Sequence, residues 1–202
     1  MKTPKVLSIA AVAAMALLAF TASSASATAL YNGTTKLSLN STSDFSVPSG
    51  GSTLFVDTSG NTLDKCTSST LRTILLNADG AVDTLAIEEF TWGNCTFATK
   101  TLDTGFLEVL WSSGTTGTVR VSLAIKVTIN TVLFGSCVYE FTSGKQLGTL
   151  TTSSSGAATF DANAVAIRSG TNSACPTTSK WTGSYTQTLP NSPVTNLRVE
   201  SS

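Results

Sequence analysis

The chain has 202 residues, with twelve basic residues, twelve acidic residues and no histidine. Because no run of like charge occurs in it, the sequence predicts neither a nucleic-acid surface nor a patch for anionic membranes. The lack of histidine also excludes Ser-His-Asp and Cys-His catalytic groups and histidine-ligated metals.

The N-terminal segment has the three parts of a secretory signal peptide. Lys2 and Lys5 are basic, Val6–Phe20 is apolar and uncharged, and Ala25–Ala27 provides small residues for cleavage. We therefore predict that residues 1–27 are a signal peptide that is removed on export. An uncleaved signal anchor is the alternative, although the apolar segment is shorter than the roughly 20 residues that cross a bilayer.

The remaining residues, 28–202, are expected to form one secreted domain, extracellular or associated with the cell surface, with no membrane span after cleavage. Residues 28–52 are richest in Ser, Thr, Asn and Gly, and we expect them to be loosely packed. Across the whole domain, Thr, Val and Ile favour strands, while Ser, Gly and Asn favour turns. The composition therefore predicts an all-β protein.

Short runs of strand-forming residues follow one another along the chain, separated by clusters of turn residues. No stretch is helical enough to cross over a sheet, so the pattern predicts an antiparallel β-sandwich of about 9–11 strands, with immunoglobulin-like and barrel-like arrangements both open. In chain order, the expected strands are Lys36–Asn40, Thr53–Asp57, Leu71–Leu76, Val82–Trp92, Phe106–Trp111, Val119–Asn130, Cys137–Phe141, Gly148–Thr152, Ala158–Arg168 and Trp181–Leu189.

Two of these strands carry a more detailed prediction. From Val119 to Asn130 apolar and polar residues alternate without a break, which predicts one long half-buried strand, bent near its middle. In Val82–Trp92 the apolar positions change parity between Ile87 and Phe90. A β-bulge at Glu88 and Glu89 would return them to one face, and we expect one there.

The four cysteines allow three disulfide pairings. Cys66 and Cys95 flank a predicted hairpin that turns at Asn77–Gly80, and Cys137 and Cys175 enclose the later strands in the same way. We therefore expect the disulfides Cys66–Cys95 and Cys137–Cys175. A metal site is the less favoured alternative, because close ligand spacing and histidine are both missing.

Other residues with functional interest are few. The adjacent Glu88 and Glu89 point to opposite faces of a strand and cannot flank one bond, so no catalytic residue and no cofactor is predicted. Trp92, Trp111 and Trp181 could form a ligand-facing platform for sugars. The alternative, which we favour, is that they pack in the core near the disulfides.

The layout from Leu63 to Pro190 is marked by Cys66, Phe90–Cys95, Cys137–Tyr139, Cys175 and Trp181–Tyr185. In this layout the chain resembles a group of small secreted proteins of unknown function, common in actinobacteria. That group is distantly similar to proteins labelled activators of alkane oxidation. The resemblance implies a bacterial two-disulfide β-sandwich outside the cell, and it transfers no binding or catalytic residue.

These observations leave three functional hypotheses. The first is a non-enzymatic extracellular or cell-surface protein with a structural, adhesive or interaction role, whose partner is a cell-surface polymer or a protein. The second is a binding module for a polysaccharide or a small apolar ligand. The third is a secreted inhibitor or a hydrolase that uses carboxylates, the inhibitor requiring a rigid loop such as the one near Cys137 and Cys175.

Overall fold

The computed structural model describes residues 27–78, 80–153, 157–188, 194 and 196–201. The predicted signal peptide lies outside these residues except for Ala27. The strands are β1 (Thr28–Asn32), β2 (Thr35–Lys36), β3 (Thr42–Ser46), β4 (Thr53–Val56), β5 (Thr62–Asn77), β6 (Asp83–Cys95), β7 (Ala98–Asp103), β8 (Phe106–Ser113), β9 (Thr116–Leu123), β10 (Ile125–Thr131), β11 (Gly135–Phe141), β12 (Gln146–Thr151), β13 (Thr159–Arg168), β14 (Thr178–Gln187) and β15 (Leu197–Ser201).

The predicted fold class is confirmed, because the described residues form an all-β, antiparallel structure with two disulfides. The number of strands is larger than the 9–11 expected. The described residues form fifteen strands. The segment predicted as one long strand is divided into β9 and β10, and four strands were not predicted: β1, β3 and β15 near the two ends of the described chain, and β7 between β6 and β8. Lys36–Asn40 was expected as a strand, but only Thr35–Lys36 forms one.

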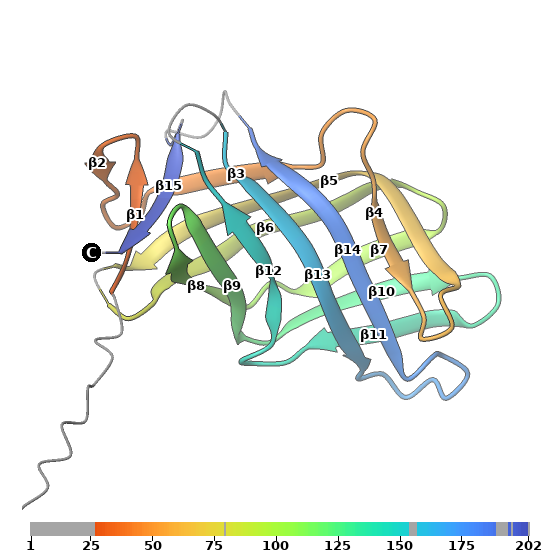
Figure 1. The fold of residues 1–202 in the computed structure, drawn as a ribbon. Coiled ribbons are helices and arrows are strands. Elements are labelled where there is room, and N and C mark those ends of the chain that lie inside the picture. The colour runs from red at the N-terminus through yellow and green to blue at the C-terminus, as the bar shows by residue number, and fades with distance from the viewer. Residues whose placement is uncertain (1–26, 79, 154–156, 189–193, 195, 202) are drawn as a thin grey trace, which may run out of the picture.

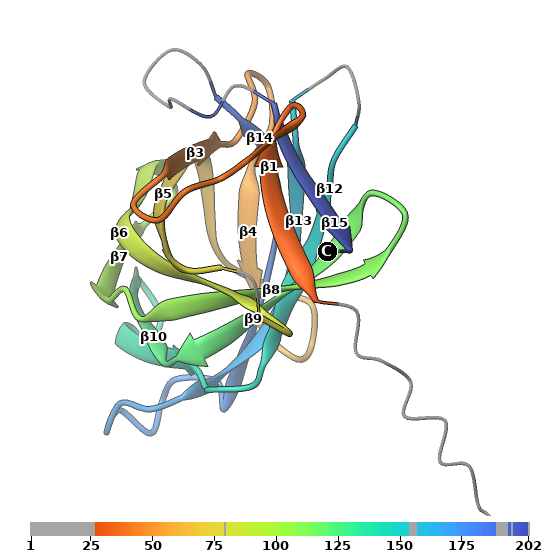
Figure 2. The ribbon, with the colours of Figure 1, turned by 90° about the vertical axis from the view of Figure 1, so that its left-hand side faces the viewer.

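The main sheet closes on itself. Its strand order runs β14-β4-β5-β6-β8-β9-β12-β13, and β13 also pairs with β14, so these strands form a continuous ring. Strands β11, β10 and β7 extend the sheet from β13, and β3 pairs with both β14 and β5. Figures 1 and 2 show the strands arranged around a common interior, with β13 and β14 on the side opposite β5 and β6. Strands on the two sides of the ring therefore face each other across one core.

The core is built around aromatic side chains from both sides of the ring. Trp181 on β14 is 1% exposed, and its indole N–H donates to Oγ1 of Thr53 at 2.7 Å. Buried aromatic pairs add roughly 0.5–1.5 kcal/mol each to the burial of their area, so this cluster holds β14 against β6. The rings with centroids 5.5–6.0 Å from Trp181 belong to Phe90, Trp92, Phe141, Phe160 and Tyr185.

The alternating segment is two strands rather than one. It breaks at Ala124, where the chain leaves β8 and β12 and begins to pair with β7 and β11. The alternation is kept across the break, so the same parity faces the core in β9 and β10. Leu123 is the exception: it was expected in the core but is 54% exposed. The buried members are Val119, Val121, Ile125, Val127 and Ile129.

The bulge predicted in β6 is present. Arg72 on β5 pairs with Glu89, whereas the next residue, Thr73, pairs with Ile87, so Glu88 is the extra residue. Ile87 and Phe90 are both buried as a result. The change of parity in the sequence therefore corresponds to the extra residue, Glu88, in β6.

The segment 28–52, for which we expected loose packing, contributes three strands. β1 pairs with β15 and β2 in a small three-stranded sheet, and β3 joins the main sheet. Ala29, Leu30 and Phe45 in these strands are buried. Apolar residues at strand positions thus fix a segment whose composition is otherwise polar.

Candidate functional site

Both disulfides predicted from the sequence are formed. Cys66 on β5 faces Cys95 on β6 directly across the strand pair, with their Cα atoms 3.8 Å apart. Cys137 on β11 is bonded to Cys175 in the connection between β13 and β14. All four cysteines are therefore used in disulfides. Disulfides form and persist in oxidising compartments, which places the folded protein in an oxidising, extracytoplasmic environment.

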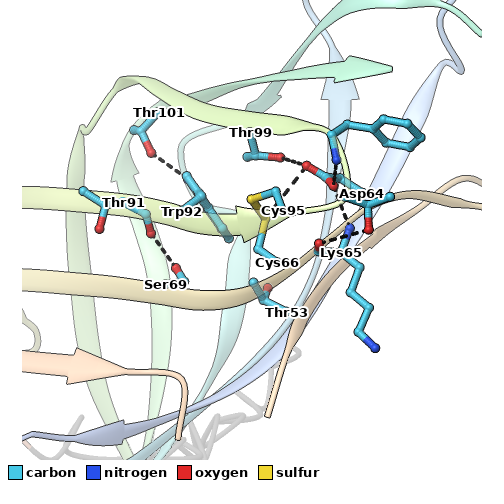
Figure 3. The surroundings of a disulfide bond; sticks show 12 residues. Thr53, Asp64, Lys65, Cys66, Ser69, Thr91, Trp92, Cys95, Thr99 and Thr101 are labelled. Carbon is cyan, nitrogen blue, oxygen red and sulfur yellow. Dashed lines mark hydrogen bonds between the residues drawn. A yellow bond between two sulfur atoms is a disulfide. The ribbon is translucent and has the colours of Figure 1, made fainter. Parts of the chain in front are cut away.

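Asp64 is a fully buried carboxylate beside the first disulfide (Figure 3). It accepts hydrogen bonds from the backbone N–H of Lys65 at 2.8 Å, from that of Phe97 at 2.9 Å and from the hydroxyl of Thr99 at 2.6 Å. The carboxylate and the two disulfide sulfurs lie within 4.8 Å of one another. Because the sulfurs are bonded to each other and the carboxylate has three donors, the group braces β5 against the turn into β7.

The three tryptophans considered as ligand-facing aromatics do not share one surface. Trp181 lies in the core and faces no ligand. Trp92 is half-buried on β6, and its indole N–H donates to Oγ1 of Thr101 at 2.9 Å. Trp111 is half-buried on β8, and its indole N–H donates to the carbonyl of Gly114 at 2.9 Å. A sugar platform made from all three side chains is therefore absent.

Strands β6 and β7 follow one another in the chain but do not pair through their backbones. β6 pairs with β5 and, at its start, with β8, whereas β7 pairs with β10. The facing edges are joined instead by a side chain, because the hydroxyl of Thr101 donates to the carbonyl of Phe90 at 2.7 Å. The same hydroxyl accepts from the indole N–H of Trp92, as Figure 3 shows. We call the line between these edges the β6–β7 seam.

An open apolar groove lies where β7 turns into β8 and β9 breaks from β10. Its volume is about 550 Å³. Leu102, Phe106 and Leu123 line it and are 55%, 38% and 54% exposed, and the buried Ile87 forms part of its floor. Phe106 and Leu123 face each other across β8 and β9. We call this the seam groove.

The shape of the seam groove depends on a close approach of two backbones. Gly105 has a φ of +61°, and a Cβ built on it would lie 2.1 Å from the carbonyl oxygen of Leu123 and 2.6 Å from that of Ala124. Only glycine fits this corner. At the edge of the groove, Nζ of Lys126 lies 3.5 Å from a carboxylate oxygen of Asp103 and 3.9 Å from one of Glu140.

The acidic pair on β6, Glu88 and Glu89, lies at the bulge, and both residues are exposed. Glu89 is exposed and pairs across the sheet with Arg72, which in turn pairs with Asp44 on β3. Arg72 donates through Nε to Asp44 at 2.8 Å. These three residues line a cavity of about 220 Å³. The guanidinium is bound to Asp44, and the register places Arg72 between Asp44 and Glu89 on neighbouring strands, which suits a charged surface better than an acid–base pair. Glu88 is exposed at the bulge.

One buried carboxyl was not predicted from the sequence. Asp83, the first residue of β6, is 0% exposed, and neither of its carboxyl oxygens accepts a well-formed hydrogen bond. Desolvation raises its pKa to about 6, although the backbone of Leu30 and the charge of Lys36 favour the ionised form. The strands β1 and β2, to which these two residues belong, cover it.

Sequence reasoning also missed Leu102 and Phe106. They flank the turn residues Asp103-Thr104-Gly105, and an apolar residue on each side of a tight turn was a signal that could have pointed to the groove. For Asp83, the available signal was its position at the same parity as Leu85 and Ile87, which were expected to share one face of the strand.

Comparison with family models, with curated proteins and with solved structures found no match to this chain. The described residues contain no helix with the length and apolarity needed to cross a membrane. The similarity to secreted actinobacterial proteins therefore stays a prediction.

Proposed function

We propose that this chain is exported and acts outside the cell, free or held at the cell surface, as a non-enzymatic interaction domain. The observation that carries the proposal is the seam groove, in which Leu102, Phe106 and Leu123 remain exposed on a scaffold braced by two disulfides. Exposed apolar side chains that gather at one groove and are rimmed by polar residues are a feature of interaction sites.

The charged residues support a non-enzymatic role. Asp44 is bound to Arg72, and Asp64 accepts hydrogen bonds from three donors, so both carboxylates are engaged in contacts within the fold. The chain also has no histidine to serve as a base. A rigid scaffold with an apolar surface suits recognition better than it suits acid–base chemistry.

A second candidate function is the binding of a small apolar ligand. The volume of the seam groove, about 550 Å³, lies within the range of pockets that hold small molecules. The charges of Lys126 and Asp103 at its edge would orient a polar end of such a ligand. This alternative uses the same residues, so one set of variants tests both.

The test compares Leu123→Asp with Leu39→Asp, which alters a side chain of equal exposure (55% against 54%) outside the groove. Fluorescence of an uncharged apolar dye should rise with the unmodified protein and with Leu39→Asp, and should fall at least several-fold with Leu123→Asp. Cell-surface components of the producing organism should likewise be retained by the immobilised unmodified protein and by Leu39→Asp, and should be retained several-fold less by Leu123→Asp. Equal binding by all three proteins would contradict the proposal, and fractionation of host cultures tests export.

A further inference from the structure

The turn between β10 and β11 carries the most exposed large apolar side chains of the described residues. Val132 is 81% exposed and Leu133 is 84% exposed. Figure 1 shows this turn projecting at one end of the molecule, beyond the neighbouring strands. Turns are usually built from Gly, Asn, Asp or Ser, so two adjacent apolar side chains at this position call for an explanation. We call Val132 and Leu133 the hairpin tip.

The backbone beneath the hairpin tip is held in place. The N–H of Phe134 donates to Oγ1 of Thr131 at 2.9 Å, and the side-chain amide of Asn172 donates to the carbonyl of Phe134 at 2.6 Å. Asn172 lies in the loop closed by the second disulfide, where Arg168 donates to the carbonyl of Cys175 at 2.6 Å. A preorganised tip loses little conformational entropy on binding, which favours insertion into a partner.

The hairpin tip and the seam groove lie at opposite ends of β10. Ala124, which lines the groove, precedes the strand, and Val132 follows it. At a rise of ~3.3 Å per residue, they are about 25 Å apart along an extended strand. The tip therefore cannot reach the groove of its own chain, and each apolar feature needs an occupant from elsewhere.

We propose that the hairpin tip of one copy inserts into the seam groove of a second copy. The contact uses two different surfaces, so repetition of it joins copies head to tail into open chains. Residues 131–136 carry no charge, so the hairpin tip meets no charge repulsion at the edge of the groove, where Lys126 lies between Asp103 and Glu140. The proposal gives a partner to the interaction role proposed above and rests on it.

The size of the contact predicts its strength. Two side chains entering one groove form an interface well below the area of stable complexes. Association should therefore be weak and concentration-dependent, and it should persist at high salt because no ion pair is required. The five side chains that it covers, Leu102, Phe106, Leu123, Val132 and Leu133, are among the nine exposed large apolar residues of the described chain.

Sedimentation velocity of the disulfide-bonded protein tests the proposal. The weight-average mass should rise with concentration for the unmodified protein and for the control Leu39→Asp. The weight-average mass should stay at the mass of one chain for Leu133→Asp, which places a charge on the hairpin tip, and for Leu123→Asp, which places a charge in the seam groove. Circular dichroism and thermal unfolding check that each variant is folded.

Mixing the two variants gives the decisive result. Leu123→Asp keeps an intact tip and Leu133→Asp keeps an intact groove, so an equimolar mixture should form dimers, with twice the mass of one chain and no longer species. A mixture that stays monomeric, or association by either variant alone, would overturn the proposal. An unmodified protein that stays monomeric while its groove still binds the apolar dye would overturn self-association but leave the proposed interaction role in place.

Discussion

The hydroxyl of Tyr185 donates to Oγ of Ser69 at 3.0 Å and so joins β14 to β5 across the core. The hydroxyl of Tyr139 on β11 is also buried but has no hydrogen-bond partner. Desolvation raises the pKa of each tyrosine to about 12. The two phenols are thus alike in burial and differ in whether their polar atom is satisfied.

This contrast predicts opposite effects of removing each hydroxyl. Tyr139→Phe removes an unsatisfied polar atom and should raise the free energy of unfolding by about 1 kcal/mol, whereas Tyr185→Phe loses a hydrogen bond and should lower it by about 1 kcal/mol. Urea unfolding at neutral pH measures both, since an unchanged slope shows that the unfolding reaction is the same. A loss of stability in Tyr139→Phe equal to that in Tyr185→Phe would show that Tyr139 has a partner.

Asp83 predicts that stability falls between about pH 4 and pH 6. Its pKa is raised from 3.8 in the unfolded chain to about 6 in the folded protein, so the folded state binds the proton more tightly. The stabilisation is full below the lower value and is lost as the pH rises through the higher one. A difference of about two units corresponds to about 3 kcal/mol.

The variant Asp83→Asn isolates this effect. It should be more stable than the unmodified protein at pH 7, and the difference between the two proteins should shrink towards pH 4. Thermal unfolding at closely spaced pH values provides the measurement. Parallel profiles across this range would mean that Asp83 ionises in the folded protein as it does in water. Hydrogen exchange of β1 would show whether ionisation loosens the strand that covers it.

The two disulfides should contribute similar amounts to stability. Their sequence separations are 29 and 38 residues, and chain entropy alone assigns each about 4 kcal/mol, with a difference below about 0.5 kcal/mol. Replacing both members of one pair by alanine, in two separate variants, and measuring urea unfolding tests this. A much larger loss for Cys66 and Cys95 would show that the buried Asp64 depends on that bond for its position.

Gly114 provides a matched control for substitutions of Gly105 at the corner of the seam groove. Both have positive φ, but a Cβ on Gly105 would collide with the backbone of Leu123, whereas a Cβ on Gly114 would meet nothing within 4 Å. Gly114→Ala should cost about 1 kcal/mol for its conformation alone. Gly105→Ala should cost clearly more in urea unfolding and should also reduce dye binding. Equal losses would show that the corner relaxes freely.

Local patterns predicted the features that depend on neighbouring strands. The pairing of Cys66 with Cys95 followed from one hairpin, and the bulge at Glu88 followed from a change of parity within one strand. The same alternation could not reveal the break at Ala124, because the inward parity is identical on both sides of it. A register shift between Phe106 and Leu107 pairs Leu123 with the exposed Phe106, whereas Val121 pairs with the buried Leu107.

The features that define the candidate site depend on contacts between distant segments. The seam exists because β7 pairs with β10 rather than with its neighbour β6, and nothing local in the sequence specifies that choice. The same holds for Asp83, which is buried only because β1 and β2 lie over it. Trp92, Trp111 and Trp181 have equal hydropathy, so their different burial follows from the position of each strand in the ring.

The pairing of β1 with β15 allows the protein to be immobilised in one orientation. Thr28 lies opposite Ser201 in that pair, and Figure 1 places both strands at the far end from the turn between β10 and β11. Coupling the chain to a solid support through either of these strands' outer ends would orient every copy alike, with the same distal hairpin directed into solution.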